Sequence, residues 1–228
     1  MSDFPESGPK DVCYWVNHEL YLRNDSTYCL NAAVEESSLG ERYQNGLLTQ
    51  DQFIQSRLSP DDILIVSVGG NDIALKPSIV TPIHFMMLLF NPFPEWLYYF
   101  GLSHFVDLFK TKIEKFLQEL TKNTKPKKVL VCMLYYFDLG DEAWPGAEYA
   151  LSFAGYYHGG NPERLKRMIR LIFRRATSEI KVDGIRIVPV PLFEVLDGSD
   201  SKDYAYRVEP SSQGGHKMAK LLLKYIDE

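Results

Sequence analysis

The stretch Gly69-Gly70-Asn71-Asp72 places two glycines, an amide and a carboxylate directly after an apolar run, Ile63 to Val68. The run does not alternate between apolar and polar residues, which is typical of a strand covered on both faces in a parallel sheet. Gly69 and Gly70 allow a tight turn or a close approach to a ligand, and Asn71 supplies an amide donor. Because open α/β sheets bind ligands at the carboxyl ends of their strands, we expect a binding loop here. An ordinary turn made of the same residues is the alternative.

The four residues after this strand resemble the Gly-x-Asn-Asp block of the SGNH (GDSL-type) esterase and lipase superfamily, in which the Asn side chain helps form the oxyanion hole. A second block of the family, Asn-x-Gly, is similar to Asn31-Ala32-Ala33, where Ala33 replaces the Gly. Ala33 can still offer its backbone N–H to an oxyanion if its φ is negative. The resemblance therefore implies oxyanion binding by Asn71, Gly69 and Ala33. For the second block, a strand end followed by a Ser-capped helix is the alternative.

The nucleophile is the weakest part of the resemblance. The family's first block, Gly-Asp-Ser, does not occur in this sequence, and the early serines Ser2 and Ser7 have no apolar strand before them. A nucleophilic serine needs a taut strand-to-helix turn to hold its hydroxyl toward a base. Met1-Ser2-Asp3 resembles the residues that follow the nucleophile in relatives reading Gly-Asp-Ser-Met-Ser-Asp. This implies a chain that begins just past its own catalytic serine, so the nucleophile is Ser2, Ser7 or a serine absent from this chain.

The base has two candidates. The family's last block, Asp-x-x-His-Pro before a helix with Gly and Met-Ala, resembles the stretch from Tyr206 to Ala219 in its Pro, Gly and Met-Ala. In that register Glu209 takes the position of the catalytic His, and a carboxylate with a usual pKa of about 4.3 is a weak base at neutral pH unless burial raises it. An alignment on His216 matches fewer residues. We expect Glu209 at a loop tip before the closing helix and His216 farther along that helix.

No metal site or organic cofactor is expected. The remaining histidines show no metal-ligand spacing among themselves: His18, His84, His104 and His158. The three cysteines lack Cys-x-x-Cys spacing, which argues against a disulfide framework and a zinc site. The resemblance implies hydrolysis of a small-molecule ester or acylated substrate through an acyl-enzyme. The alternative is a catalytically inactive relative that binds a lipid, glycan or protein partner.

Composition limits the class of protein. With 228 residues, 45% hydrophobic and 24% charged, residues 1–228 fit one globular domain. A formal net charge of −5 does not favour binding to nucleic acid. The first ten residues lack the basic start and apolar core of a signal peptide, and prolines and charges interrupt the apolar region 79–109, so we expect no membrane span and a cytoplasmic protein.

The rest of the chain predicts elements that place the loop in an α/β fold. Further strands are predicted at 28–30, 129–136 and 185–191, and helices at 11–23, at 39–58 with a break near Asn45-Gly46, at 107–120, 161–180 and 211–225. Strands that alternate with helices favour a mainly parallel sheet between helices on both faces. The resemblance implies a flavodoxin-like, three-layer α/β/α order. The family's first, central strand has no counterpart before Asp11, so we expect an open sheet edge that invites self-association.

Overall fold

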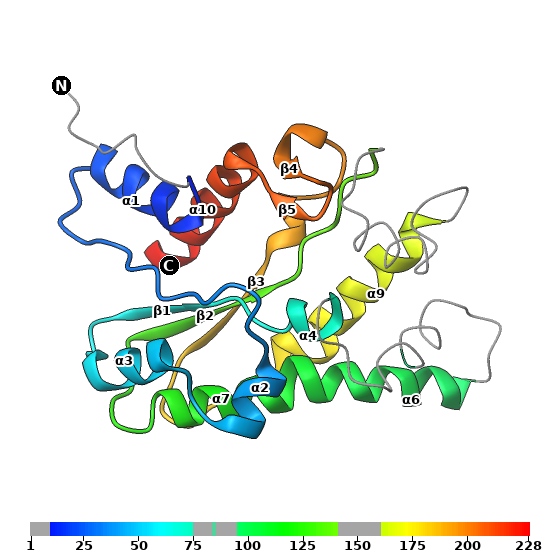
Figure 1. Ribbon diagram of the computed structural model, residues 1–228, viewed down its shortest axis with the longest axis horizontal. Helices are drawn as coiled ribbons and strands as arrows, with labels where there is room; N and C mark the ends of the chain where they lie inside the picture. Colours follow the sequence, from blue (N-terminus) through cyan, green and yellow to red (C-terminus); the bar gives the residue numbers. More distant parts are fainter. Residues whose placement is uncertain (1–9, 75–83, 85–94, 141–160) are drawn as a thin grey trace. The chain divides into compact units, whose positions relative to one another are not determined.

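The computed structural model describes residues 10–74, 84, 95–140 and 161–228. The chain divides into two compact units, and Figure 1 shows the elements of each. The sheet unit comprises Ala32–Leu134 and Pro145–Pro191, and the terminal unit comprises Met1–Asn31, Tyr135–Trp144 and Leu192–Glu228. Each unit has its own helices, strands and apolar core.

A three-stranded parallel sheet is the centre of the sheet unit. Its strands are β1 (Ile63–Val66), β2 (Lys128–Met133) and β3 (Ile187–Pro191), in the order β1-β2-β3. In register, Leu130 of β2 lies between Ile65 of β1 and Val188 of β3. The middle strand is buried along its whole length, as its continuous apolar run predicts. The fold is therefore mixed α/β with a small parallel sheet.

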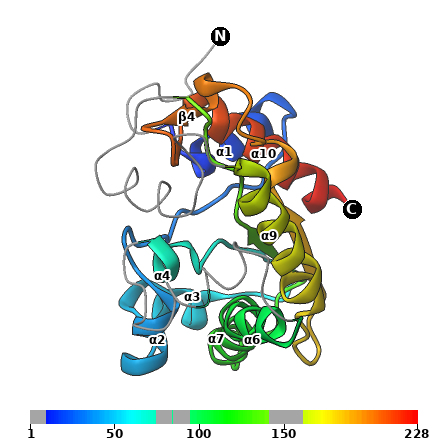
Figure 2. The same ribbon diagram turned by 90° about the vertical axis from the view of Figure 1, so that its right-hand side faces the viewer.

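Eight helical segments accompany this sheet in the described part of the unit: α2 (Leu39–Asn45), α3 (Thr49–Arg57), α4 (Gly70–Ala74), α6 (Glu95–Val106), η1 (Asp107–Lys112), α7 (Ile113–Leu120), α9 (Pro162–Arg175) and η2 (Thr177–Glu179). Figures 1 and 2 show α6, η1 and α7 as one continuous helix, in which η1 is a π-helical stretch. The predicted helix at 107–120 is confirmed, although it begins earlier, at Glu95. The break near Asn45-Gly46 is also confirmed, because Gly46 ends α2 with a positive φ of 84°.

The terminal unit is built on two paired helices, α1 (Val12–Leu22) and α10 (Ser212–Asp227). The unit also contains two short 3₁₀ helices, η3 (Leu192–Glu194) and η4 (Ser201–Asp203). A short antiparallel pair of strands, β4 (Tyr204–Ala205) and β5 (Glu209–Pro210), completes it. The apolar seam between the helices consists of two i, i+4 pairs: Val16 and Leu20 on α1, Ala219 and Leu223 on α10. Asp11 and Ser211 cap the two helices through their side chains.

One predicted strand is wrong. Residues 28–30 form no strand, because the side-chain amide of Asn17 takes the place of a neighbouring strand. Asn17 Oδ1 accepts the Cys29 N–H at 2.6 Å, and Asn17 Nδ2 donates to the Cys29 carbonyl at 2.9 Å. Both backbone groups of Cys29 are thus satisfied by one side chain.

Some predictions lie outside the described residues, including Ser2, Ser7, His158 and any element before residue 10. Among the helices that the structure does describe, none combines the length and the apolar character needed to cross a bilayer.

Candidate functional site

The loop after β1 turns at Gly69, the position where only glycine fits. Gly69 is buried and has a φ of +96°, and a Cβ placed there would lie 2.9 Å from Cε1 of Phe109, in the π-helical stretch η1. Other residues are strained at such a φ, and the aromatic ring leaves no room for a methyl group. The short helix α4, which contains Asn71 and Asp72, begins directly after this turn at Gly70.

Asn71 connects this loop to the segment that contains Ala33. Its Nδ2 donates to the carbonyl oxygen of Ser37 at 2.9 Å, across 34 positions of sequence. Among the described residues this is the hydrogen bond that the Asn71 amide makes, and an amide has two hydrogens to donate. Ala33 is exposed, four residues before Ser37. The Asn71 side chain therefore contacts the segment from Ala32 to Ser38 within the sheet unit.

Asp72, in the same loop, binds the backbone at the start of α2. Its two carboxylate oxygens accept the backbone N–H groups of Leu39 at 2.8 Å and of Gly40 at 2.7 Å, at the start of α2. The carboxylate is buried and occupies the positive end of that helix. Asp72 thus fixes the position of α2, and with it the segment that Asn71 contacts.

The serine hydroxyls closest in sequence to this contact also hold the backbone. The Ser37 hydroxyl donates to Val34 O at 2.7 Å and accepts from Arg42 Nη1 at 3.0 Å. Ser38 caps α2: its Oγ accepts the Glu41 N–H, and the Glu41 carboxylate accepts the Ser38 N–H. Arg42 in turn forms a buried ion pair with Asp51. These serines shape the loop. The Ser38 hydroxyl also lies 3.3 Å from the Glu41 carboxylate, but both groups are engaged with backbone N–H groups of the cap.

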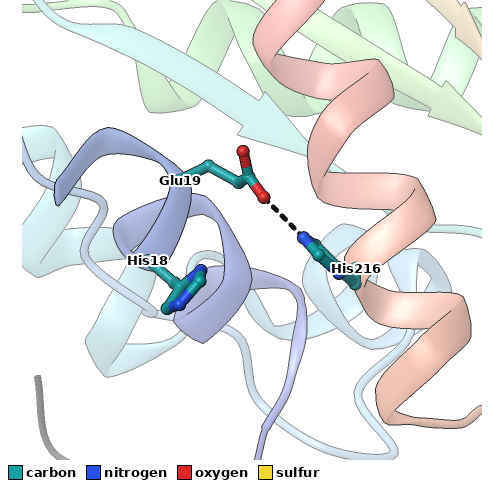
Figure 3. Close-up of side chains that lie close together, drawn as sticks. All are labelled: His18, Glu19 and His216. Carbon is teal, nitrogen blue, oxygen red and sulfur yellow. Dashed lines mark hydrogen bonds and ion pairs between the residues drawn. The ribbon is translucent and has the colours of Figure 1, made fainter. Parts of the chain in front are cut away.

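A second cluster of chemically active side chains lies in the terminal unit (Figure 3). His18 and Glu19 come from α1 and His216 comes from α10, and one nitrogen or oxygen of each lies within 4.8 Å of the others. Nε2 of His216 is 2.5 Å from Oε1 of Glu19. The Glu19 side chain is 15% exposed and that of His216 is 29% exposed, so water can reach both.

Neighbouring groups favour the charged form of Glu19 in this cluster. The hydrogen bond with His216 lowers the pKa of Glu19 below its ordinary value, and the positive charge of Lys220, whose Nζ lies 3.9 Å from Oε1, lowers it further. The indole of Trp15 stacks on the imidazole of His216, with ring centres 4.2 Å apart and planes inclined by 18°. Stacking and hydrogen bonding together hold the His216 ring in one orientation.

Glu209 lies in a short β-hairpin, whereas the sequence places it at a loop tip. Tyr206 and Arg207 form the tip of that hairpin in the left-handed conformation, with φ of 51° and 69°, and Glu209 pairs with Ala205 across it. The side chain of Glu209 is exposed.

The predicted site residues divide between the units. The sheet unit contains Gly69, Asn71 and Ala33, and the terminal unit contains Glu209 and His216. Sequence reasoning missed Glu19 and His18 as partners of His216, because the two histidines are 198 positions apart and share no motif. A faint signal exists in Gly215 and Ala219, since small residues on one helix face allow a close helix neighbour.

No protein-family model matches the sequence, and no curated protein sequence matches it. The candidate site rests on the residues and the geometry of this chain.

Proposed function

We propose that this protein is an SGNH-type ester hydrolase that binds the oxyanion of its acyl-transfer intermediate with the loop 69–72. The observation that carries the proposal is the hydrogen bond from Asn71 Nδ2 to Ser37 O at 2.9 Å. It joins the Gly-x-Asn-Asp-like loop, at the carboxyl end of a parallel strand, to the Asn-x-Gly-like segment that contains Ala33. The parallel sheet is compatible with the flavodoxin-like order that this family implies.

In the proposed reaction a serine hydroxyl attacks the ester carbonyl, and negative charge develops on the carbonyl oxygen. The second Asn71 amide hydrogen and the backbone N–H groups of Ala33 and Gly69 are the proposed donors to that oxygen. Donors of this kind lower the barrier because they are aimed before the charge forms, and the loss of one reduces kcat by about 10²–10³. Asp72 and Gly69 contribute by fixing the loop.

Two residues remain candidates for the base. Glu209 has the better position in the family's last block, but it is exposed. His216 is hydrogen-bonded to the Glu19 carboxylate through Nε2. A carboxylate that bonds the imidazole also orients the base in serine hydrolases, where it does so through Nδ1. The candidate nucleophiles are Ser2 and Ser7, and the proposed substrate is a small ester or an acylated molecule.

The test combines turnover with covalent labelling. The purified chain is assayed with p-nitrophenyl butyrate and treated with a fluorophosphonate probe, and the modified peptide is identified by mass spectrometry. We expect turnover, one labelled serine, and loss of both signals when that serine is changed to Ala. His216→Gln and Glu209→Gln then identify the base, because replacement of the true base lowers kcat and replacement of the other residue does not. Absence of both turnover and labelling in folded protein contradicts the proposal.

A second candidate is a catalytically inactive relative that binds an acyl ligand at the same loop. It is favoured by the engagement of Ser37 and Ser38, whose hydroxyls cap backbone groups beside Asn71. Titration with butyrate, whose carboxylate imitates an oxyanion, is followed through the Asn71 side-chain resonances by NMR. Saturable shifts at Asn71 in a protein without turnover support this candidate. Turnover, or unchanged Asn71 resonances, contradicts it.

A further inference from the structure

The pairing of α1 with α10 brings three metal-binding side chains close together (Figure 3). His18 and Glu19 are adjacent on α1, and His216 faces them from α10 beside the seam of Val16, Leu20 and Ala219. A Cβ at Gly215 would meet Trp15 at an ordinary van der Waals distance of 3.5 Å. The helix contact, which is set by apolar packing, therefore determines how near the three ligand atoms come.

We propose that His18, Glu19 and His216 bind a divalent transition-metal ion of the Zn²⁺ class. Two imidazole nitrogens and one carboxylate oxygen form a ligand set that suits Zn²⁺, and three protein ligands leave a fourth position for water. Hard cations such as Mg²⁺ and Ca²⁺ prefer sets made mainly of oxygen, which this cluster does not offer. The proposal goes beyond ester hydrolysis and does not depend on it. A His216 that binds the ion does not serve as the base, so the metal-bound protein leaves Glu209 as the candidate for that role.

The geometry is close to that of a bound ion. Ligands at about 2.1 Å from a tetrahedral ion are about 3.4 Å apart. The three ligand atoms here lie within 4.8 Å of one another, and Nε2 of His216 is 2.5 Å from Oε1 of Glu19. Changes in side-chain torsion that move the ligand atoms by about an ångström bring them to the spacing of a bound ion. The partial exposure of all three residues gives a hydrated ion access to them.

Two neighbours influence the affinity in opposite directions. Trp15 stacks on His216 and limits its motion, so less ordering is needed when an ion binds. Lys220 places a positive charge 3.9 Å from the Glu19 carboxylate and competes with the ion. The proposal therefore predicts that Lys220→Gln strengthens binding, an effect that a mere ion pair between the helices does not produce.

The experiment uses the whole chain without a polyhistidine tag. Co²⁺, whose visible absorption reports its coordination, is titrated into metal-free protein and then displaced by Zn²⁺. We expect one site, and a weakening of at least about 100-fold in His216→Gln and in His18→Gln, because even partners that only orient a ligand contribute 10–100-fold. The Lys220→Gln variant should bind Co²⁺ and Zn²⁺ several-fold more tightly than wild type. Zn²⁺ should raise the melting temperature of wild type but not that of His216→Gln or His18→Gln.

Controls exclude other ligands and loss of fold. His104→Gln alters a different histidine–histidine pair, the stacked rings of His104 and His84, and should leave Zn²⁺ affinity unchanged. Cys13→Ser tests the thiol of α1 in the same way. Circular dichroism verifies that each variant is folded. Failure of wild type to bind Zn²⁺ or Co²⁺, or binding that survives His216→Gln but not Cys13→Ser, overturns the proposal. Because the readouts are absorption and melting, a lack of esterase turnover does not affect the result.

Discussion

Replacement of Asp72 by Ala should destabilise the protein strongly, because Asp72 alone satisfies two backbone N–H groups at the start of α2. Its oxygens accept from Leu39 N at 2.8 Å and from Gly40 N at 2.7 Å, and its side chain is buried. A hydrogen bond to a charged group contributes about 1.5–3 kcal/mol. Two such bonds to one carboxylate are not fully additive, so we expect a loss of about 3 kcal/mol in the free energy of unfolding.

The Asn variant separates the two bonds. Asp72→Asn keeps one carbonyl oxygen as an acceptor but turns an N–H₂ group toward the other backbone donor, so about half the loss is expected, about 1.5 kcal/mol. Asp61→Asn is the matched control: Asp61 is an exposed residue of the same unit, and its replacement should change the stability by less than about 0.5 kcal/mol.

Urea unfolding followed by far-ultraviolet circular dichroism measures these differences, with the slope of the transition monitored as a check on two-state behaviour. The expected order of destabilisation is Asp72→Ala, then Asp72→Asn, then Asp61→Asn. If Asp72→Ala unfolds within about 0.5 kcal/mol of wild type, the carboxylate does not hold α2 and the reasoning about the loop is refuted.

Three further predictions concern stability. Gly69→Ala should lower the free energy of unfolding by about 2–4 kcal/mol, since its Cβ would lie 2.9 Å from Phe109 at a φ of +96°. Gly184→Ala, at a φ of +71° with open space around it, should lower it by only about 1 kcal/mol. Equal losses of stability in urea unfolding would contradict this. Arg42→Ala leaves Asp51 buried without its cation (side chains 7% and 6% exposed) and should lower the free energy of unfolding by about 3–5 kcal/mol. Arg23→Ala, in an exposed pair with Asp227, should lower it by less than about 1 kcal/mol. The reverse order in thermal melts would refute the structural importance of the buried pair. The lowered pKa of Glu19 means that its stabilisation is complete above its ordinary pKa of 4.5 and is lost as the pH falls through the lowered pKa. The difference in free energy of unfolding between wild type and Glu19→Gln should therefore shrink as the pH falls below 4.5, and a difference that grows toward acid would contradict this.

The sheet and most helices could be predicted because their signals are local. The mainly apolar segments at 63–68, 129–136 and 185–191 each coincide with most or all of a strand of the parallel sheet. Asp11 and Asn161-Pro162 cap helices as their residue types predict. Such features depend on a few neighbouring residues, so a single sequence contains the information.

The site could be predicted only in part because its contacts are distant in sequence. Asn71 follows its strand as expected, but the capping of α2 by Asp72 joins residues 33 positions apart, and a local pattern contains no sign of it. Likewise, the partners of His216 depend on which helix packs against α10. The short strand predicted at 28–30 failed for the same reason, because the Asn17 amide competes for its backbone groups from 12 positions away.

The most direct test of the central claim is the kcat of Asn71→Ala for p-nitrophenyl butyrate, measured beside that of Asn123→Ala. Asn123 is an exposed residue of the same unit, outside the loop 69–72 and the segment of Ala33, and its replacement should leave kcat unchanged. If Asn71 stabilises the oxyanion, kcat of Asn71→Ala falls by about 10²–10³ while KM changes little, in protein that still folds. A kcat for Asn71→Ala within about twofold of wild type would contradict an oxyanion-binding role for this loop.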